Sequence, residues 1–124
     1  MGLKVIGFAD HFWDETIPGA SGGFEELNFK HVMSIKEMLP DEKNALKVLV
    51  GCETEYRGNG NIAISSQVAE RFDFVLVPTS HVHFESVRPP GVKTAKDIAK
   101  LMVTHFKEVL EFDFITGMAH PFLP

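Results

Sequence analysis

The stretch Asp73-Phe74-Val75-Leu76-Val77-Pro78-Thr79-Ser80-His81-Val82-His83 is the starting point for interpreting this chain. It opens with a nearly continuous apolar run rich in β-branched and aromatic residues, which is typical of a strand buried on both faces. It ends in hydroxyl and imidazole side chains, which can bind metal ions or substrate. Because His81 and His83 are two residues apart, an extended backbone would point both imidazoles to the same side.

Three other apolar stretches are also followed by side chains that can bind metals. Leu3–Ala9 precedes Asp10 and His11, Leu46–Cys52 precedes Glu53-Thr54-Glu55, and Phe112–Ala119 precedes His120. Ligand sites of α/β enzymes lie at the carboxyl ends of parallel strands. We therefore expect the polar ends of the four segments to meet in one place.

Helical patterns separate the predicted strands. Phe24–Leu39 is predicted as a helix ended by Pro40, and a capping sequence at Thr94 begins a strongly periodic helix through Leu110. Ser65 or Ser66 is expected to cap a short helix. Residues 61–64 are expected to form a short extra strand in a hairpin. Strands joined by helical crossovers predict an α/β fold with a parallel sheet, in one domain over residues 1–124.

Composition excludes several classes of protein. The 124 residues carry a net charge of −5 with no basic run, which disfavours general nucleic-acid binding. No apolar run is long enough to span a bilayer, and the N-terminal sequence lacks the pattern of a secretory signal. Cys52 is the single cysteine, so an intrachain disulfide is impossible. We expect a cytoplasmic protein.

The placement of the six histidines indicates a metal site. His31 and His105 fall inside predicted helices, where surface or structural roles are expected. Other histidines come directly after predicted strands, and a carboxylate, Glu53, occupies the same position after the predicted strand that has no histidine there. The predicted ligands are therefore His11, Glu53, His81 and His120. Imidazole and carboxylate suit zinc, manganese or iron, so we expect divalent ions of this kind as cofactors.

Four further residues are expected around this cluster, with alternatives left open. Glu55 could be an acid/base group, a partner of a ligand or a solvated charge. His83 could orient a ligand or contact substrate. Arg57 and Arg88 lie in predicted loops on the same side, where each could hold a phosphate group or simply confer solubility.

In these segments the sequence resembles the PHP (polymerase and histidinol phosphatase) superfamily of metal-dependent phosphoesterases. The matching pieces, in the family's order, are Gly7-Phe8-Ala9-Asp10-His11, Gly51-Cys52-Glu53-Thr54-Glu55, Phe72 to His81, and Gly117-Met118-Ala119-His120-Pro121. The resemblance implies a distorted, TIM-like (β/α) barrel with two or three metal ions. It also implies that Glu53 is the carboxylate bridging two of them.

The family's opening His-x-His motif and its late Asp and His ligands have no counterpart in this sequence. We therefore expect a partial (β/α) barrel corresponding to the middle of the family's fold. Such a half-barrel exposes two sheet edges and an apolar face. Other polypeptide, or a second copy of the chain in a homo-oligomer, would be expected to cover them.

The leading functional hypothesis is a phosphomonoesterase of the histidinol phosphatase type acting on a small phosphate ester. Glu53, His81 and His120 are the residues expected to act in catalysis, with metal-activated water as the nucleophile. One alternative is a catalytically inactive fragment or assembly module that keeps the fold. Another is an amidohydrolase-like enzyme, which would share most of these ligands.

Overall fold

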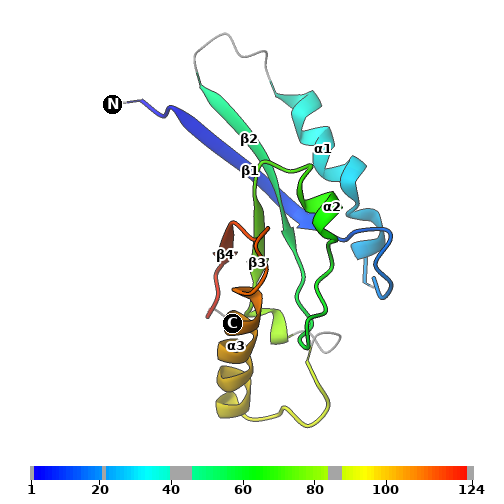
Figure 1. The fold of residues 1–124 in the computed structure, drawn as a ribbon, viewed down its shortest axis with the longest axis vertical. Helices are drawn as coiled ribbons and strands as arrows, with labels where there is room; N and C mark the ends of the chain where they lie inside the picture. The colour runs from blue at the N-terminus through cyan, green and yellow to red at the C-terminus, as the bar shows by residue number, and fades with distance from the viewer. Residues whose placement is uncertain (1, 21, 40–45, 84–87, 123–124) are drawn as a thin grey trace.

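Four parallel strands with a helix between each consecutive pair form the framework of the protein (Figure 1). The computed structural model describes residues 2–20, 22–39, 46–83 and 88–122. The strands are β1 (Val5–Phe12), β2 (Lys47–Thr54), β3 (Val75–Pro78) and β4 (Gly117–Ala119). They lie in the order β1-β2-β3-β4. The expected α/β class with a parallel sheet and helical crossovers is confirmed.

Each helix begins where a polar side chain accepts a hydrogen bond from the first turn. The helices are α1 (Phe29–Met38), α2 (Ser66–Ala69) and α3 (Ala95–Val109). Their N-caps are Asn28, Ser65 and Thr94, whose side chains accept from the amides of residues 31, 68 and 97. The predicted starts of α2 and α3 are confirmed.

The continuous helix predicted from Phe24 is wrong. Phe24–Glu26 forms a separate 3₁₀ turn, η1, and α1 begins only at Phe29. The reason is local, because the Asn28 side chain caps α1 in extended backbone and so interrupts the helical path.

Two strand predictions also change. The predicted last strand is shorter and later, at Gly117–Ala119, because residues 112–115 form a turn in which the Ile115 amide donates to the Phe112 carbonyl. The predicted hairpin over 61–64 is reduced to one antiparallel bridge between Tyr56 and Ile62.

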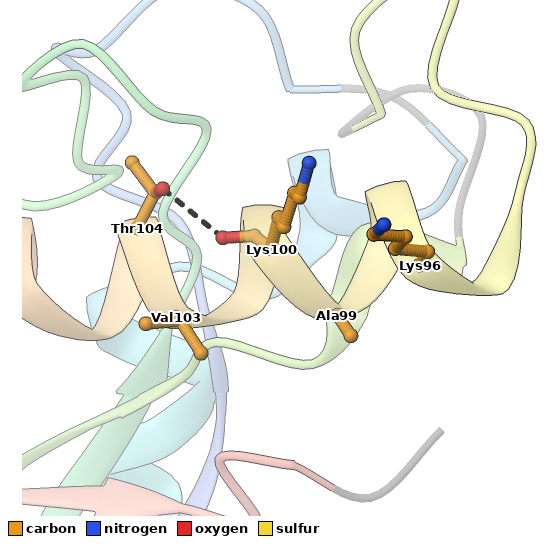
Figure 2. A pocket seen from close by; sticks show the side chains of 5 residues that line it. All are labelled: Lys96, Ala99, Lys100, Val103 and Thr104. Carbon is orange, nitrogen blue, oxygen red and sulfur yellow. Dashed lines mark hydrogen bonds between the residues drawn. The ribbon is translucent and has the colours of Figure 1, made fainter.

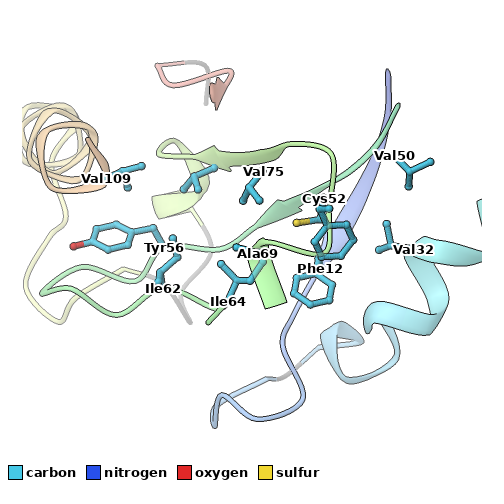
Figure 3. Close-up of a cluster of buried hydrophobic side chains, with 12 residues drawn as sticks. Phe12, Val32, Val50, Cys52, Tyr56, Ile62, Ile64, Ala69, Val75 and Val109 are labelled. Carbon is cyan, nitrogen blue, oxygen red and sulfur yellow. The ribbon is translucent and has the colours of Figure 1, made fainter. Parts of the chain in front are cut away.

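All three helices contribute buried residues to one apolar cluster that includes residues from one face of the sheet. In the β2–β3 register Cys52 is paired with Val75, so their side chains share a face. The buried core joins these residues to Val32 from α1 and Val109 from α3, which Figure 3 shows at opposite ends of the cluster. Burial raises the pKa of the Cys52 thiol to about 12, which makes it unreactive at neutral pH.

The opposite face of the sheet, here called the glycine-lined face, carries glycine and alanine residues beside the larger Leu49 and Leu76. The small residues are Gly7 and Ala9 on β1, Gly51 on β2, and Gly117 and Ala119 on β4. The ring of Phe74, which precedes β3, lies across two of these glycines. A Cβ atom would be 3.0 Å from that ring at Gly7 and 2.5 Å from it at Gly51. Glycine is therefore required where the ring crosses β2.

His105 on α3 is a buried structural residue. It is 2% exposed and packs edge-on against the Tyr56 ring, with centroids 5.1 Å apart. Its Nδ1 atom is buried with no hydrogen-bond partner in the described part of the chain. Burial lowers the pKa of His105, and the nearby charge of Glu108 opposes this only in part.

No helix in the described ranges combines the length and the apolar character needed to cross a membrane.

Replacing Gly51 by Ala is expected to destabilise the fold by about 1–3 kcal/mol, the usual cost of overpacking a close contact. The new methyl group would meet both the Phe74 ring and the Phe74 carbonyl oxygen, and the backbone atom cannot rotate away. Urea unfolding measures the difference. Gly2→Ala is the matched control, because a Cβ atom there has no neighbour within 4 Å. Equal unfolding midpoints for the two variants would contradict this account of the sheet face.

The His105→Gln variant is expected to lose less stability on acidification than the wild type. Because the pKa of His105 is lowered in the folded state, the unfolded chain binds more protons below about pH 6.5. This histidine therefore removes stability as the pH falls through that range, and glutamine, which stays neutral, does not. Urea unfolding at pH 7.5 and at pH 5.5 measures the effect. Equal losses in the two proteins would refute it.

Candidate metal centre

The β1–β2 register brings the first two predicted ligands together. His11 lies directly opposite Glu53 in the parallel ladder, so both side chains leave the sheet on the glycine-lined face. His11 Nδ1 is 3.6 Å from Glu53 Oε1 and 3.8 Å from Glu55 Oε1. The edge of the Phe24 ring faces the His11 ring, with centroids 5.9 Å apart.

Glu53, His81 and His120 form a group that could hold a metal ion. One ligand atom from each lies within 4.8 Å of the others. His120 Nε2 is 3.7 Å from Glu53 Oε1, and the His81 and His120 ring centroids are 5.2 Å apart. The three side chains come from the ends of β2, β3 and β4, as the sequence pattern predicted.

Two neighbouring side chains fix the orientation of these imidazoles. Glu55 Oε1 is 2.8 Å from His81 Nδ1, and Ser80 Oγ is 2.9 Å from His120 Nδ1. With the Nδ1 atoms engaged in this way, Nε2 is the ring nitrogen that each histidine can offer to a cation.

The donor set suits a cation. His11 Nδ1 and Glu55 Oε2 are buried and have no hydrogen-bond partner among the residues that the structure describes. Unpaired buried polar atoms are costly, and a positive ion next to them would offset that cost. His11 and His120 keep 43% and 38% of their side-chain surface exposed, so solvent reaches the cluster.

The electrostatics of His81 connect metal binding to pH. Burial by itself lowers the pKa of His81, but the hydrogen bond that Glu55 accepts from it and the charges of Glu55 and Glu53 outweigh burial and raise this pKa. A proton on His81 competes with a cation for the same ring, so metal affinity should increase with pH.

His81 and His83 do not lie in extended backbone. They belong to a 3₁₀ turn, η2 (His81–His83), in which successive residues are rotated by about 120°. The expectation of extended backbone over these two histidines is therefore wrong. His81 joins the cluster from this turn instead.

The two predicted arginines lie in loops. The Arg57 guanidinium stacks over the Trp13 ring at 5.1 Å and donates to the Pro18 carbonyl oxygen at 3.3 Å. These contacts attach it to the loop that follows β1. Arg88 is half-buried just before α3. A substrate role for these arginines, for Glu55 and for His83 stays a prediction.

The loop after β1 is anchored by Asp14, a buried carboxylate that the sequence analysis did not identify. It accepts hydrogen bonds from the amide and hydroxyl groups of both Thr16 and Ser65. Burial would raise the pKa of Asp14, but these four hydrogen bonds together lower it. This network ties the loop to the N-terminus of α2.

Sequence analysis also missed Ser80 as a partner of His120. Its position within the polar run Thr79-Ser80-His81, directly after β3, was the available signal. The 40-residue separation between Ser80 and His120 meant that only the folded chain could show the pairing.

A surface hollow elsewhere lies along α3 alone (Figure 2). Its five lining residues are all exposed and are Lys96, Ala99, Lys100, Val103 and Thr104. The Thr104 hydroxyl donates to a carbonyl of its own helix, at Lys100. Because no buried polar group faces it, this hollow carries no candidate site.

Comparisons with family models, with curated proteins and with solved structures find no match for this chain.

The His120→Ala variant is expected to bind zinc more than about 100-fold more weakly than the wild type, since loss of even an orienting neighbour costs 10- to 100-fold. Isothermal titration calorimetry with Zn²⁺ measures the affinity. His31→Ala is the matched control, because His31 is an exposed histidine on α1 that contacts Asp10 rather than the cluster. Equal zinc affinities for the two variants would show that His120 is not a ligand.

Proposed function

We propose that this chain is a metal-dependent phosphomonoesterase with a PHP-type partial (β/α) barrel fold. The observation that carries the proposal is the convergence of Glu53, His81 and His120, with His11 beside them, at the carboxyl ends of four parallel strands. That edge is where parallel α/β enzymes place their active sites.

Glu53 lies between imidazoles of two other strands. Its Oε1 atom is 3.6 Å from His11 Nδ1 and 3.7 Å from His120 Nε2. The resemblance to the PHP superfamily implies that this carboxylate would bridge two ions. Imidazole and carboxylate donors accept zinc, manganese or iron, and we propose ions of this group as the cofactors.

Bound divalent ions would supply an activated water and would neutralise charge on the transferring phosphoryl group. The chain's own residues contribute position. Glu53, His81 and His120 would hold the ions, and the half-exposed His11 and His120 leave the cluster open to a small phosphate ester. The small and exposed Ala9, on the same sheet face, leaves room beside it.

The proposed fold also implies a neighbour. The glycine-lined face and the outer edge of β1 correspond to the interior and the open side of a barrel. A further polypeptide or a second copy of the chain would complete it. We propose that the protein is cytoplasmic. We propose neither general nucleic-acid binding nor membrane binding.

A second candidate is an inactive assembly module of the same fold. It is favoured by the size of the cluster: among the described residues, one group of three side chains has metal-ligand spacing, and His11 is outside that group. Such a module would bind a metal for stability and would not turn over substrate.

Glu53→Gln and His81→Ala are each expected to abolish hydrolysis of phosphate esters, because each removes a donor from the proposed centre. The assay uses p-nitrophenyl phosphate and a panel of small phosphate monoesters, with Mn²⁺ or Zn²⁺ and after chelation. Amide substrates in parallel test the amidohydrolase-like alternative. Glu37→Gln, an exposed position on α1, is the control that should retain wild-type rates.

Hydrolysis that persists in a metal-free preparation would contradict the proposed mechanism. Metal binding without turnover of any ester or amide would favour the assembly module instead.

A further inference from the structure

Glu55 is the most deeply buried charged side chain beside the cluster. It is 1% exposed, although it lies only two residues beyond Glu53, which is 17% exposed. Its Oε1 atom is 2.8 Å from His81 Nδ1 and 3.8 Å from His11 Nδ1. Its Oε2 atom is buried, and within the described ranges it has no hydrogen-bond partner.

We propose that Glu55 is a positioning residue that acts on the metal through His81 and is neither a metal ligand nor a substrate contact. It accepts a hydrogen bond from the Nδ1–H group of His81, which fixes the tautomer with Nε2 unprotonated and aims that nitrogen at the ion. This inference rests on the proposed metal centre and adds a role that the ligand set does not contain.

The geometry favours this role over direct ligation. Glu55 is not in the group whose donor atoms lie within 4.8 Å of one another, whereas its hydrogen-bond partner His81 is. A carboxylate that receives an imidazole N–H makes the opposite nitrogen a stronger donor to a metal. The negative charge of Glu55 would therefore act on the ion through the His81 ring and without touching the ion.

Burial gives the interaction a second consequence. A carboxylate this deeply buried needs a compensating positive charge. An ion held by His81 would supply this charge one side chain away, so Glu55 and the ion should stabilise each other.

His120 provides an internal comparison. Its Nδ1 atom is held by the Ser80 hydroxyl at 2.9 Å, which fixes the ring by a neutral hydrogen bond. The two histidines therefore have partners of similar geometry and different charge. If the charge of Glu55 matters, its removal should weaken metal binding more than removal of the Ser80 hydroxyl.

The test measures Zn²⁺ affinity of the full chain by isothermal titration calorimetry. Glu55→Gln keeps an oxygen acceptor at nearly the same place and removes only the charge. It is expected to weaken zinc binding by about 10- to 100-fold, the usual effect of losing a residue that orients a ligand. Ser80→Ala is expected to cause a smaller loss.

Glu108→Gln is the matched control. Glu108 also accepts a side-chain hydrogen bond, from the Tyr56 hydroxyl at 2.9 Å, but it lies on α3 and packs on the helix-covered side of the sheet. The zinc affinity of the Glu108→Gln variant should equal that of the wild type. A Glu55→Gln affinity equal to the control would overturn the proposal.

A measurement on the wild type makes the test independent of how the variants fold. ¹⁵N NMR of the histidine rings in the zinc-loaded protein should show His81 bound to zinc through Nε2 and protonated on Nδ1. Zinc on Nδ1 would overturn the role of Glu55 and leave the metal centre intact. A wild type that binds none of Zn²⁺, Mn²⁺ and Fe²⁺ would overturn the metal centre itself, and with it the proposed function.

Discussion

The parallel pairing of β1 with β2 is the constraint on which the rest of the molecule depends. It runs over eight residue pairs, from Val5 with Lys47 to Phe12 with Thr54, whereas the β2–β3 and β3–β4 ladders are much shorter. Because side chains alternate along each strand, this one register decides which residues face the helices and which face the site. A slip of one residue would bury Glu53 in the core and expose Cys52.

The two faces of the sheet have different roles. One face is covered by α1, α2 and α3 and holds nearly all of the close-packed apolar core. The other carries glycine and alanine beside Leu49 and Leu76, is crossed by the Phe74 ring, and ends in the imidazoles and carboxylates of the cluster. Most of the apolar packing thus lies on one face and the candidate metal ligands on the other, and the contact of Phe74 with Gly51 is a place on the ligand face where packing also constrains the sequence.

Local patterns predicted most of this architecture. Apolar runs located the strands, capping residues located α2 and α3, and the strand ends named three side chains that do form a metal-competent group. What could not be predicted depends on contacts distant in sequence or on backbone turns. The pairing of Glu55 with His81 spans 26 residues, and the 3₁₀ turn at His81 has no signature as strong as a glycine or a proline. The break before α1 depended on one capping asparagine within an otherwise helical pattern.

The buried thiol of Cys52 makes the protein convenient for spectroscopy. It is the single cysteine of the chain, it is fully inaccessible, and its pKa of about 12 leaves almost no thiolate at neutral pH. A cysteine introduced at an exposed position would therefore react alone with a maleimide dye or spin label, with no need to remove the native one. Pairs of such labels across the glycine-lined face would report directly on whether another polypeptide or a second copy settles against it.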